Sequence, residues 1–113
     1  MKQIFDFLEN TDLSATVCDK DGIVVYQNTV AIKNDGNAIG KNLFNCHSAK
    51  TNDKIKTMLE TGTKHVYEIM QKGKRSLVYH TPWFEKDDGE ISGIIELVME
   101  LPEQYPIINR DKQ

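Results

Sequence analysis

The side chains best suited to chemistry in this chain are its two cysteines and three histidines, and one of each stands side by side. Cys46 and His47 lie in the stretch GKNLFNCHSAK, residues 40–50. Neighbouring residues of an extended segment point to opposite sides, so these two cannot easily hold one metal ion, and a structural zinc site needs four ligands. The same adjacency keeps the histidine from activating the cysteine as a nucleophile. We therefore predict no metal site and no catalytic residue, and we expect the chain not to be an enzyme.

A milder role remains for the same pair. A cysteine near the N-terminus of a helix can have a lowered pKa, which would make Cys46 a redox-sensitive thiol. The alternative is a buried cysteine that packs as a small hydrophobe, beside a histidine that forms hydrogen bonds in a loop. We favour this alternative, and keep Cys46 and His47 as candidates for a redox or haem site.

The pair precedes the clearest predicted helix of the central region. Residues 49–61 place Ile55, Met58 and Leu59 on one face, at the spacing of a helix. Gly62 can end this helix in the left-handed conformation. His47 therefore lies just before the helix and not inside it.

Short β-rich segments surround this helix. Residues 14–19 and 23–28 are joined by Asp21-Gly22, a strong hairpin signal. Three more strands are predicted at the end of the chain, within the ranges 64–71, 75–85 and 91–101. In the last of them, apolar and polar residues alternate, which predicts one buried face and one face partly exposed to solvent, here called the wet face. We expect the buried face to carry Ile91, Ile95, Leu97, Met99 and Leu101, and the wet face to carry Ser92, Glu96 and Glu100.

The two ends of the chain differ in character from its middle. Residues 1–10 predict a short amphipathic helix, too short to be stable alone, which must pack on something. Residues 102–113 contain two prolines and little periodicity, and predict an irregular tail. The expected organisation is a capping helix over 1–10, one domain over 11–101 and this tail.

Composition limits the partners that we expect. The 113 residues carry a net charge of -3 with no basic stripe, so the electrostatic footprint of a nucleic-acid binder is missing. No apolar run approaches the roughly 20 residues of a membrane span, and the N-terminus does not read as a signal peptide. Two cysteines form no disulfide framework. We expect a cytoplasmic protein with no nucleic-acid or membrane partner.

The order and spacing of three motifs resemble those of PAS domains over about residues 10–101. The motifs are TVCDKDGIVVYQN, IGKNLFNCH and YHTPWFEKDDGEISGIIELVMEL. The residues at places that match the family pattern are Asp19, Gly22, Val24, Asn28, Gly40, Lys41, Gly89 and Gly93. The central stretch further resembles a bacterial and archaeal subgroup with a Cys-His pair before the long helix.

The resemblance implies an α+β fold: a five-stranded antiparallel sheet, with short helices and one longer helix inserted between strands 2 and 3. It also implies a small cavity and a non-catalytic sensory role. The chain would bind a small ligand or a signalling protein, and would form a homodimer. Pro102 and Pro106 oppose a helical continuation after the last strand. We therefore expect a stand-alone bacterial PAS module or an excised fragment.

The residues that bind cofactors in PAS domains can be compared with the residues at the matching positions of this sequence. Light-sensing PAS domains bond flavin through a cysteine, and Leu43 stands at that place here, so flavin is disfavoured. Haem-binding members use a histidine inside the long helix, where this sequence has none. Haem binding would therefore need His47, His65 or His80 as the axial ligand. We expect no cofactor.

Two further sets of residues complete the predictions. The ligand-pocket candidates are Asn28, Leu43, Phe44, Ile55, Leu59, Tyr79 and His80. The dimer-interface candidates are Ile4, Phe5, Phe7, Leu8, Ile94 and Val98.

Overall fold

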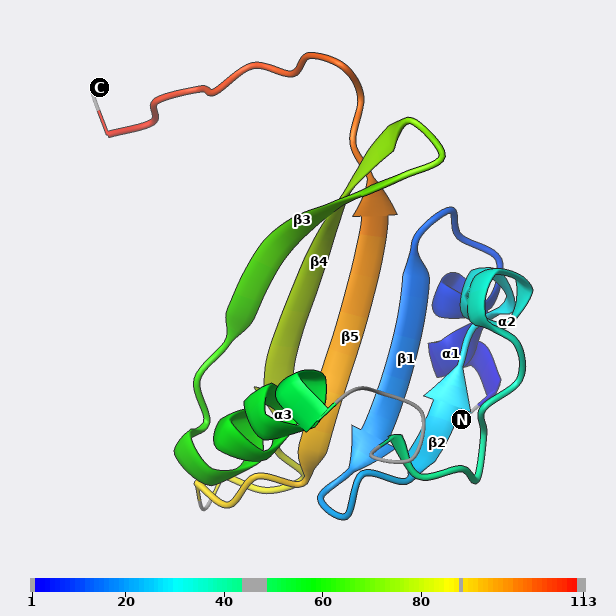
Figure 1. Ribbon diagram of the computed structural model, residues 1–113, viewed down its shortest axis with the longest axis vertical. Coiled ribbons are helices and arrows are strands. Elements are labelled where there is room, and N and C mark those ends of the chain that lie inside the picture. Colours follow the sequence, from blue (N-terminus) through cyan, green and yellow to red (C-terminus); the bar gives the residue numbers. More distant parts are fainter. Residues whose placement is uncertain (1, 44–48, 88, 112–113) are drawn as a thin grey trace.

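The computed structural model describes residues 2–43, 49–87 and 89–111, and Figure 1 shows their arrangement. The described elements are α1 (Lys2–Glu9), β1 (Ser14–Asp19), β2 (Val24–Gln27), α2 (Thr29–Asp35), α3 (Ala49–Thr61), β3 (His65–Gln71), β4 (Lys74–Trp83) and β5 (Gly93–Glu100). All neighbouring strands pair antiparallel, in the order β2-β1-β5-β4-β3. The expected α+β fold is confirmed, with α2 and α3 between the second and third strands.

The first hairpin turns where the sequence predicts it. The side chain of Asp19 accepts hydrogen bonds from the N–H groups of Asp21 and Ile23, at 2.9 and 3.0 Å. Gly22 has a φ of 84°, which favours glycine. A local acceptor and a glycine thus fix the turn that sets the register of β1 against β2.

Asn28 joins four parts of the N-terminal half and is fully buried. Its Oδ1 accepts from the N–H groups of Ala15 and Ala31, the second of which caps α2. Its Nδ2 donates to the carbonyls of Leu8 and Leu13, both at 2.8 Å. One amide thereby ties α1, the start of β1 and α2 together, which is a structural role and not the ligand-binding role predicted for it.

Helix α3 packs as its spacing predicts. Ile55 and Met58 are buried with Cys18 and Ile94, and Leu59 packs partly buried against this cluster. Gly62 follows the helix with a φ of 72°, and its N–H donates to the carbonyl of Met58. The helix therefore ends at the predicted glycine and covers one face of the sheet, here called the inner face (Figure 1).

A glycine allows three segments to meet at the start of β5. A Cβ added at Gly93 would stand 1.9 Å from the carbonyl oxygen of Cys18 and 2.5 Å from Nε1 of Trp83. The same indole N–H donates to that carbonyl at 3.0 Å. No other residue fits here, so Gly93 fixes how closely β5 approaches the turn after β1.

The predicted assignment of the two faces of the last strand is wrong along the strand. β5 begins at Gly93, and Ile94, only 4% exposed, points into the core with Cys18 and Ile55. Directly paired residues share a face, so the register Thr16↔Glu96↔His80 places Glu96 on the inner face as well. The opposite or outer face carries Ile95, Leu97 and Met99, which are only partly buried. Val98, which pairs with Ser14 and Val78, is on the inner face too, so neither Ile94 nor Val98 is available for the dimer interface predicted for them.

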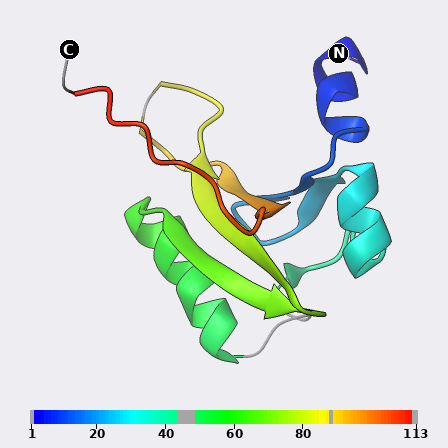
Figure 2. The ribbon, with the colours of Figure 1, turned by 90° about the horizontal axis from the view of Figure 1, so that it is seen from above.

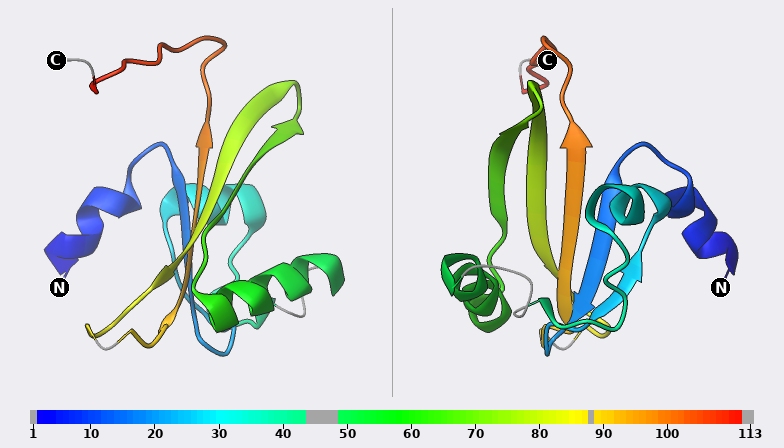
Figure 3. Two further views of the ribbon diagram at one scale, coloured as in Figure 1. Left: turned by 90° about the vertical axis from the view of Figure 1, so that its left-hand side faces the viewer. Right: turned by 45° about the vertical axis from the view of Figure 1, so that its right-hand side comes forward.

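Helix α1 lies apart from the other helices. Figures 2 and 3 show it beyond the β2 end of the sheet and on the side opposite α2 and α3. The side chains of Ile4 and Phe5 lie outside the described set, whereas Phe7 is 83% exposed and Leu8 is at the margin of exposure. Residues 102–111 leave β5 as an extended segment without helix or strand.

The Asn28 amide gives a stability prediction. Asn28→Ala leaves two N–H groups and two carbonyls without their partner, so we expect a loss of about 3 kcal/mol or more in the free energy of unfolding. Urea denaturation followed by circular dichroism measures it.

Asn34→Ala is the matched control, because Asn34 is exposed in the same helix, and we expect its effect to stay within about 0.5 kcal/mol. Asn28→Asp should lie between the two, because the carboxylate keeps both acceptor contacts and loses both donor contacts. Equal stability of Asn28→Ala and Asn34→Ala would contradict the assignment.

Candidate functional site

A cavity of about 180 Å³ lies between the inner face of the sheet and α3. Strands β1, β3, β4 and β5 supply the polar wall, and α3 with the segment before it supplies aliphatic side chains. The lining residues are Thr16, Cys18, Leu43, Ile55, Tyr67, His80, Ile94 and Glu96.

The polar centre of the cavity is a histidine–carboxylate pair. His80 on β4 and Glu96 on β5 are register partners, and Nε2 of His80 lies 2.6 Å from Oε2 of Glu96. Because a carboxylate can only accept, the proton lies on Nε2 and is donated to Glu96. His80 is 7% exposed and Glu96 keeps 31% of its side chain exposed. The pair is thus held at the edge between the core and the cavity.

Two more rings from β3 join this pair. The rings of His65 and His80 are nearly parallel, with centroids 5.9 Å apart. Tyr67 tilts against both, at 4.8 Å from His65 and 5.8 Å from His80. This follows from the register His65↔His80 and from the two-residue period of β3, which brings Tyr67 to the same face.

Burial changes the acid–base behaviour of these rings. Desolvation, together with the positive charge of Lys54 and the ring of His80, lowers the pKa of His65. Desolvation, with the negative charge of Glu96 as the second cause, raises the pKa of Tyr67. Tyr67 therefore keeps its proton at neutral pH and can donate a hydrogen bond.

Cys18 is the cysteine that lines the cavity, and its surroundings make it unreactive. It is buried, and burial is the largest cause that raises the pKa of its thiol. Because the thiolate is the nucleophile, a raised pKa disfavours nucleophilic attack by this thiol at neutral pH. Among the described residues, no group of three or more His, Cys, Asp or Glu side chains could hold a metal ion.

Solved structures share the fold of this chain, although no family model and no curated protein matches it. The C-terminal domain of a Streptococcus mutans protein is 24% identical, with a TM-score of 0.70 over 88% of this chain and 83% of that one. The PAS domain of a Colwellia psychrerythraea protein is 15% identical, with a TM-score of 0.64 over 91% of this chain and 98% of that one. The fold is that of a PAS domain.

VqmA, known from Vibrio cholerae, also resembles this PAS fold. In its structure bound to DPO it is 19% identical, with a TM-score of 0.69 over 89% of this chain. The chain spans only 58% of that VqmA chain. The likeness therefore concerns the fold, and VqmA contains a large part with no counterpart in the residues compared.

The PAS cavity gathers only some of the predicted pocket residues. Leu43, Ile55 and His80 line it, whereas Leu59 packs beside it. Tyr79 does not line it, because its register partners Val66 and Leu97 place it on the outer face, under Nζ of Lys64. Phe44, Cys46 and His47 lie outside the described residues.

Sequence reasoning missed most of the polar wall. Thr16, Cys18, Tyr67 and Glu96 line the cavity without having been predicted there. The available signal was the two-residue period: once His80 is placed inside, its cross-strand partner must be inside too.

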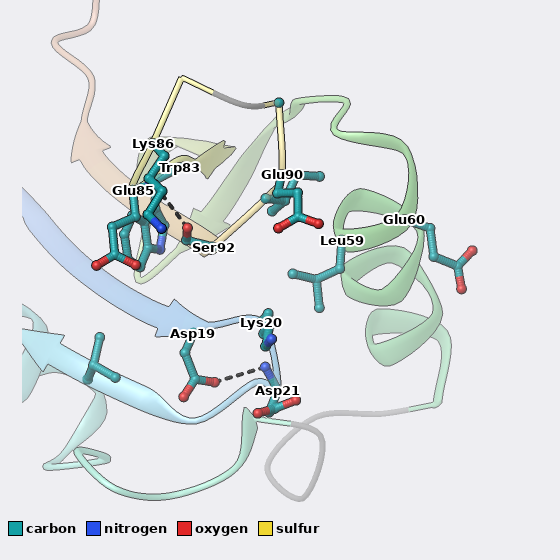
Figure 4. Close-up of a pocket in the computed structure, with 13 residues that line it drawn as sticks. Asp19, Lys20, Asp21, Leu59, Glu60, Trp83, Glu85, Lys86, Glu90 and Ser92 are labelled. Carbon is teal, nitrogen blue, oxygen red and sulfur yellow. Dashed lines mark hydrogen bonds between the residues drawn. The ribbon is translucent and has the colours of Figure 1, made fainter.

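A wider groove of about 640 Å³ opens at the end of the sheet (Figure 4). Its side chains are mostly charged and exposed, and Glu60 points away from it. The carboxylate of Asp19 already accepts a hydrogen bond within the β1–β2 turn, and the indole N–H of Trp83 already donates to the carbonyl of Cys18. The groove thus offers little that is buried and free to bind, so the smaller cavity is the candidate site.

The cavity is small for the large cofactors of the family. Pockets for drug-sized ligands occupy roughly 300 Å³ or more, well above the 180 Å³ enclosed by the described walls. The described walls therefore enclose less space than such pockets, and Nε2 of His80 is already engaged by Glu96. No helix among the described residues is long and apolar enough to span a membrane.

The lowered pKa of His65 gives a prediction about pH. The unfolded chain takes up a proton near pH 6.5, whereas folded His65 does so only at a lower pH. The unfolded state therefore binds more protons in this interval, and the free energy of unfolding should fall as the pH drops below about 6.5. Proton NMR titration of the His65 ring and urea denaturation at each pH measure both effects.

Variants identify the cause. Lys54→Gln should move the pKa of His65 part of the way back, and Lys33→Gln on α2 should not. His65→Gln should flatten the pH dependence of unfolding in this interval. A His65 midpoint at or above the usual value would refute the burial of this ring.

Proposed function

We propose that the chain is a sensory PAS module that binds one small ligand in the cavity between α3 and the sheet. The observation that carries the proposal is a set of polar groups that face the cavity without a partner among the described residues. Thr16, Tyr67 and Glu96 line it, and neither of the two hydroxyls nor Oε1 of Glu96 hydrogen-bonds to a described residue.

Unpaired polar groups at a cavity wall favour a ligand over simple packing. Thr16 is buried, where polar groups normally have hydrogen-bond partners, whereas Tyr67 and Glu96 are partly exposed. Ligand sites are typically apolar cavities with a few well-placed polar groups. Leu43, Ile55 and Ile94 give the apolar part here. The VqmA structure bound to DPO supports the idea that a protein containing a fold of this kind can hold a ligand.

Binding without catalysis is the role that this wall favours. Catalysis by a nucleophile needs an activated side chain beside a base. Cys18 keeps its proton because burial raises its pKa, and the proton-bearing Nε2 of His80 is directed at Glu96. Within the described part of the chain these side chains bind and orient, and they do not attack.

The ligand proposal predicts a difference between two threonines. Thr16→Val removes the hydroxyl at the cavity and keeps the side-chain shape, so ligand affinity should fall about tenfold. Native mass spectrometry, after incubation with the small-molecule fraction of a cell extract, reports the bound mass.

Thr81→Val is the control, because Thr81 pairs with Ile95 on the outer face. The wild type and Thr81→Val should carry one added small molecule, and Thr16→Val should carry less. The proposal fails if the wild type binds nothing, or if both variants bind equally.

We further propose that the outer face pairs with a second copy of the chain. This face presents a contiguous, partly buried apolar surface across three strands, formed by Val17, Leu77, Tyr79, Ile95, Leu97 and Met99. Exposed apolar surface of this kind is typical of an interaction site. Helix α1 projects on the same side and exposes Phe7, so it can extend the interface (Figure 3).

The two faces of β5 offer a path for the signal. Glu96 reaches the cavity, while its neighbours Ile95 and Leu97 reach the outer face. A ligand that favours one position of β5 would thereby shift the population of dimer arrangements, to the extent that it binds the two states differently. A cytoplasmic location remains part of this proposal.

The dimer proposal predicts an effect of charge on the outer face. Leu97→Glu places a carboxylate in the centre of that face, and Phe7→Ser removes apolar area from α1, so each should weaken the dimer at least tenfold. Size-exclusion chromatography with light scattering measures the mass over a range of concentrations.

Ile39→Glu is the control, because Ile39 is an exposed apolar residue of the loop after α2. Circular dichroism checks that each variant is folded. A monomer mass for the wild type at high micromolar concentration would refute the interface, and a dimer unchanged by Leu97→Glu would place it elsewhere.

A further inference from the structure

The charge of the cavity wall restricts which ligands can bind, if the proposed function holds. Glu96 is the only carboxylate among the lining residues, and none of them is a lysine or arginine. A carboxylate or phosphate ligand would therefore approach a like charge, with no lysine or arginine among the described lining residues to offset it. Like charges brought together in a partly desolvated site repel strongly, so the wall selects against anions.

The hydrogen-bonding groups restrict the ligand further. Nε2 of His80 hydrogen-bonds to Oε2 of Glu96 and so fixes the orientation of the carboxylate. The other oxygen, Oε1, is left as an oriented acceptor. The hydroxyls of Thr16 and Tyr67 can either donate or accept. The wall thus contains one group that can only accept, and a matching ligand must supply at least one N–H or O–H donor to it.

The size and walls of the cavity indicate a single ring. An engineered protein cavity of about 150 Å³ binds benzene, so 180 Å³ holds one six-membered ring with a small substituent. The rings of Tyr67 and His80 lie among the lining residues, and so do the aliphatic side chains of Ile55 and Ile94. Aromatic and aliphatic walls together suit a flat apolar ring.

We infer that the cavity binds a one-ring compound, neutral or cationic, that donates a hydrogen bond to Glu96, and that it excludes anions of the same shape. Glu96 is then the residue that determines ligand specificity. His80 is a positioning residue that holds its carboxylate.

Three probes of nearly equal shape test this inference: benzamidine, benzamide and benzoate. The first is a cation with N–H donors, the second a neutral molecule with N–H donors, and the third an anion without a donor. Each is titrated into the full chain, and the amide NMR signals of the lining residues report the dissociation constant. We expect benzamidine and benzamide to bind, and benzoate to bind at least tenfold more weakly, because a hydrogen bond to a charged group is lost and a repulsion is gained.

Two glutamate variants locate the preference. Glu96→Gln removes the charge and should reduce the ratio between benzamidine and benzoate at least tenfold. Glu100→Gln is the matched control on the same strand, where the glutamate is exposed and pairs with Lys74, and it should leave the ratio unchanged. The wild-type series needs no variant, so the test holds even if Glu96→Gln folds poorly.

The outcomes separate this inference from the function on which it rests. Benzoate that binds as tightly as benzamidine, or a preference that persists in Glu96→Gln, overturns the ligand class and leaves binding in the cavity intact. Failure of all three probes at millimolar concentration overturns the ligand class as well. Native mass spectrometry with the Thr16 and Thr81 variants then decides independently whether the cavity binds another ligand.

Discussion

The hydrogen bond between His80 and Glu96 decides which side of the central strands faces inward. A glutamate on the inner face of a sheet would be costly without a partner, because a desolvated carboxylate must be paired or protonated. His80 supplies that partner from the neighbouring strand at 2.6 Å. With Glu96 inside, the two-residue period of β5 also places Ile94 inside and Ile95 and Leu97 outside. The core below α3, the polar wall of the cavity and the apolar outer face all follow from this placement.

Local signals were enough to predict the elements. Asp21-Gly22 predicted the first turn, and Gly62 predicted the end of α3. The apolar spacing of Ile55 and Met58 predicted the face that α3 buries. Each of these signals acts over a few residues, which is why it can be read from the sequence. The resemblance to PAS domains then predicted that all five strands form one antiparallel sheet, which no local signal contains, whereas the order of the strands in that sheet was not predicted.

The residues of the site could not be predicted in the same way, because their roles depend on partners far away in the sequence. Glu96 was expected on the wet face since a lone glutamate usually is, and its partner His80 lies 16 residues away. Tyr79 was assigned to the pocket, although it is one residue from His80 and therefore on the other face. Asn28 was assigned to the pocket because it is polar and part of a motif, but its four backbone contacts use the whole amide for structure.

The same alternation that misled the prediction puts β5 at the centre of the proposed signalling route. Its residues belong in turn to the cavity and to the outer face, and it lies between β1 and β4 in the middle of the sheet. Strand neighbours are bonded on both sides, so β5 cannot move alone. A shift at Glu96 must therefore involve His80 on β4 and Thr16 on β1, which pair with it directly. Gly93 fixes one end of the strand against Cys18 and Trp83. The opposite end of the strand, at Met99 and Glu100, leads into the extended tail.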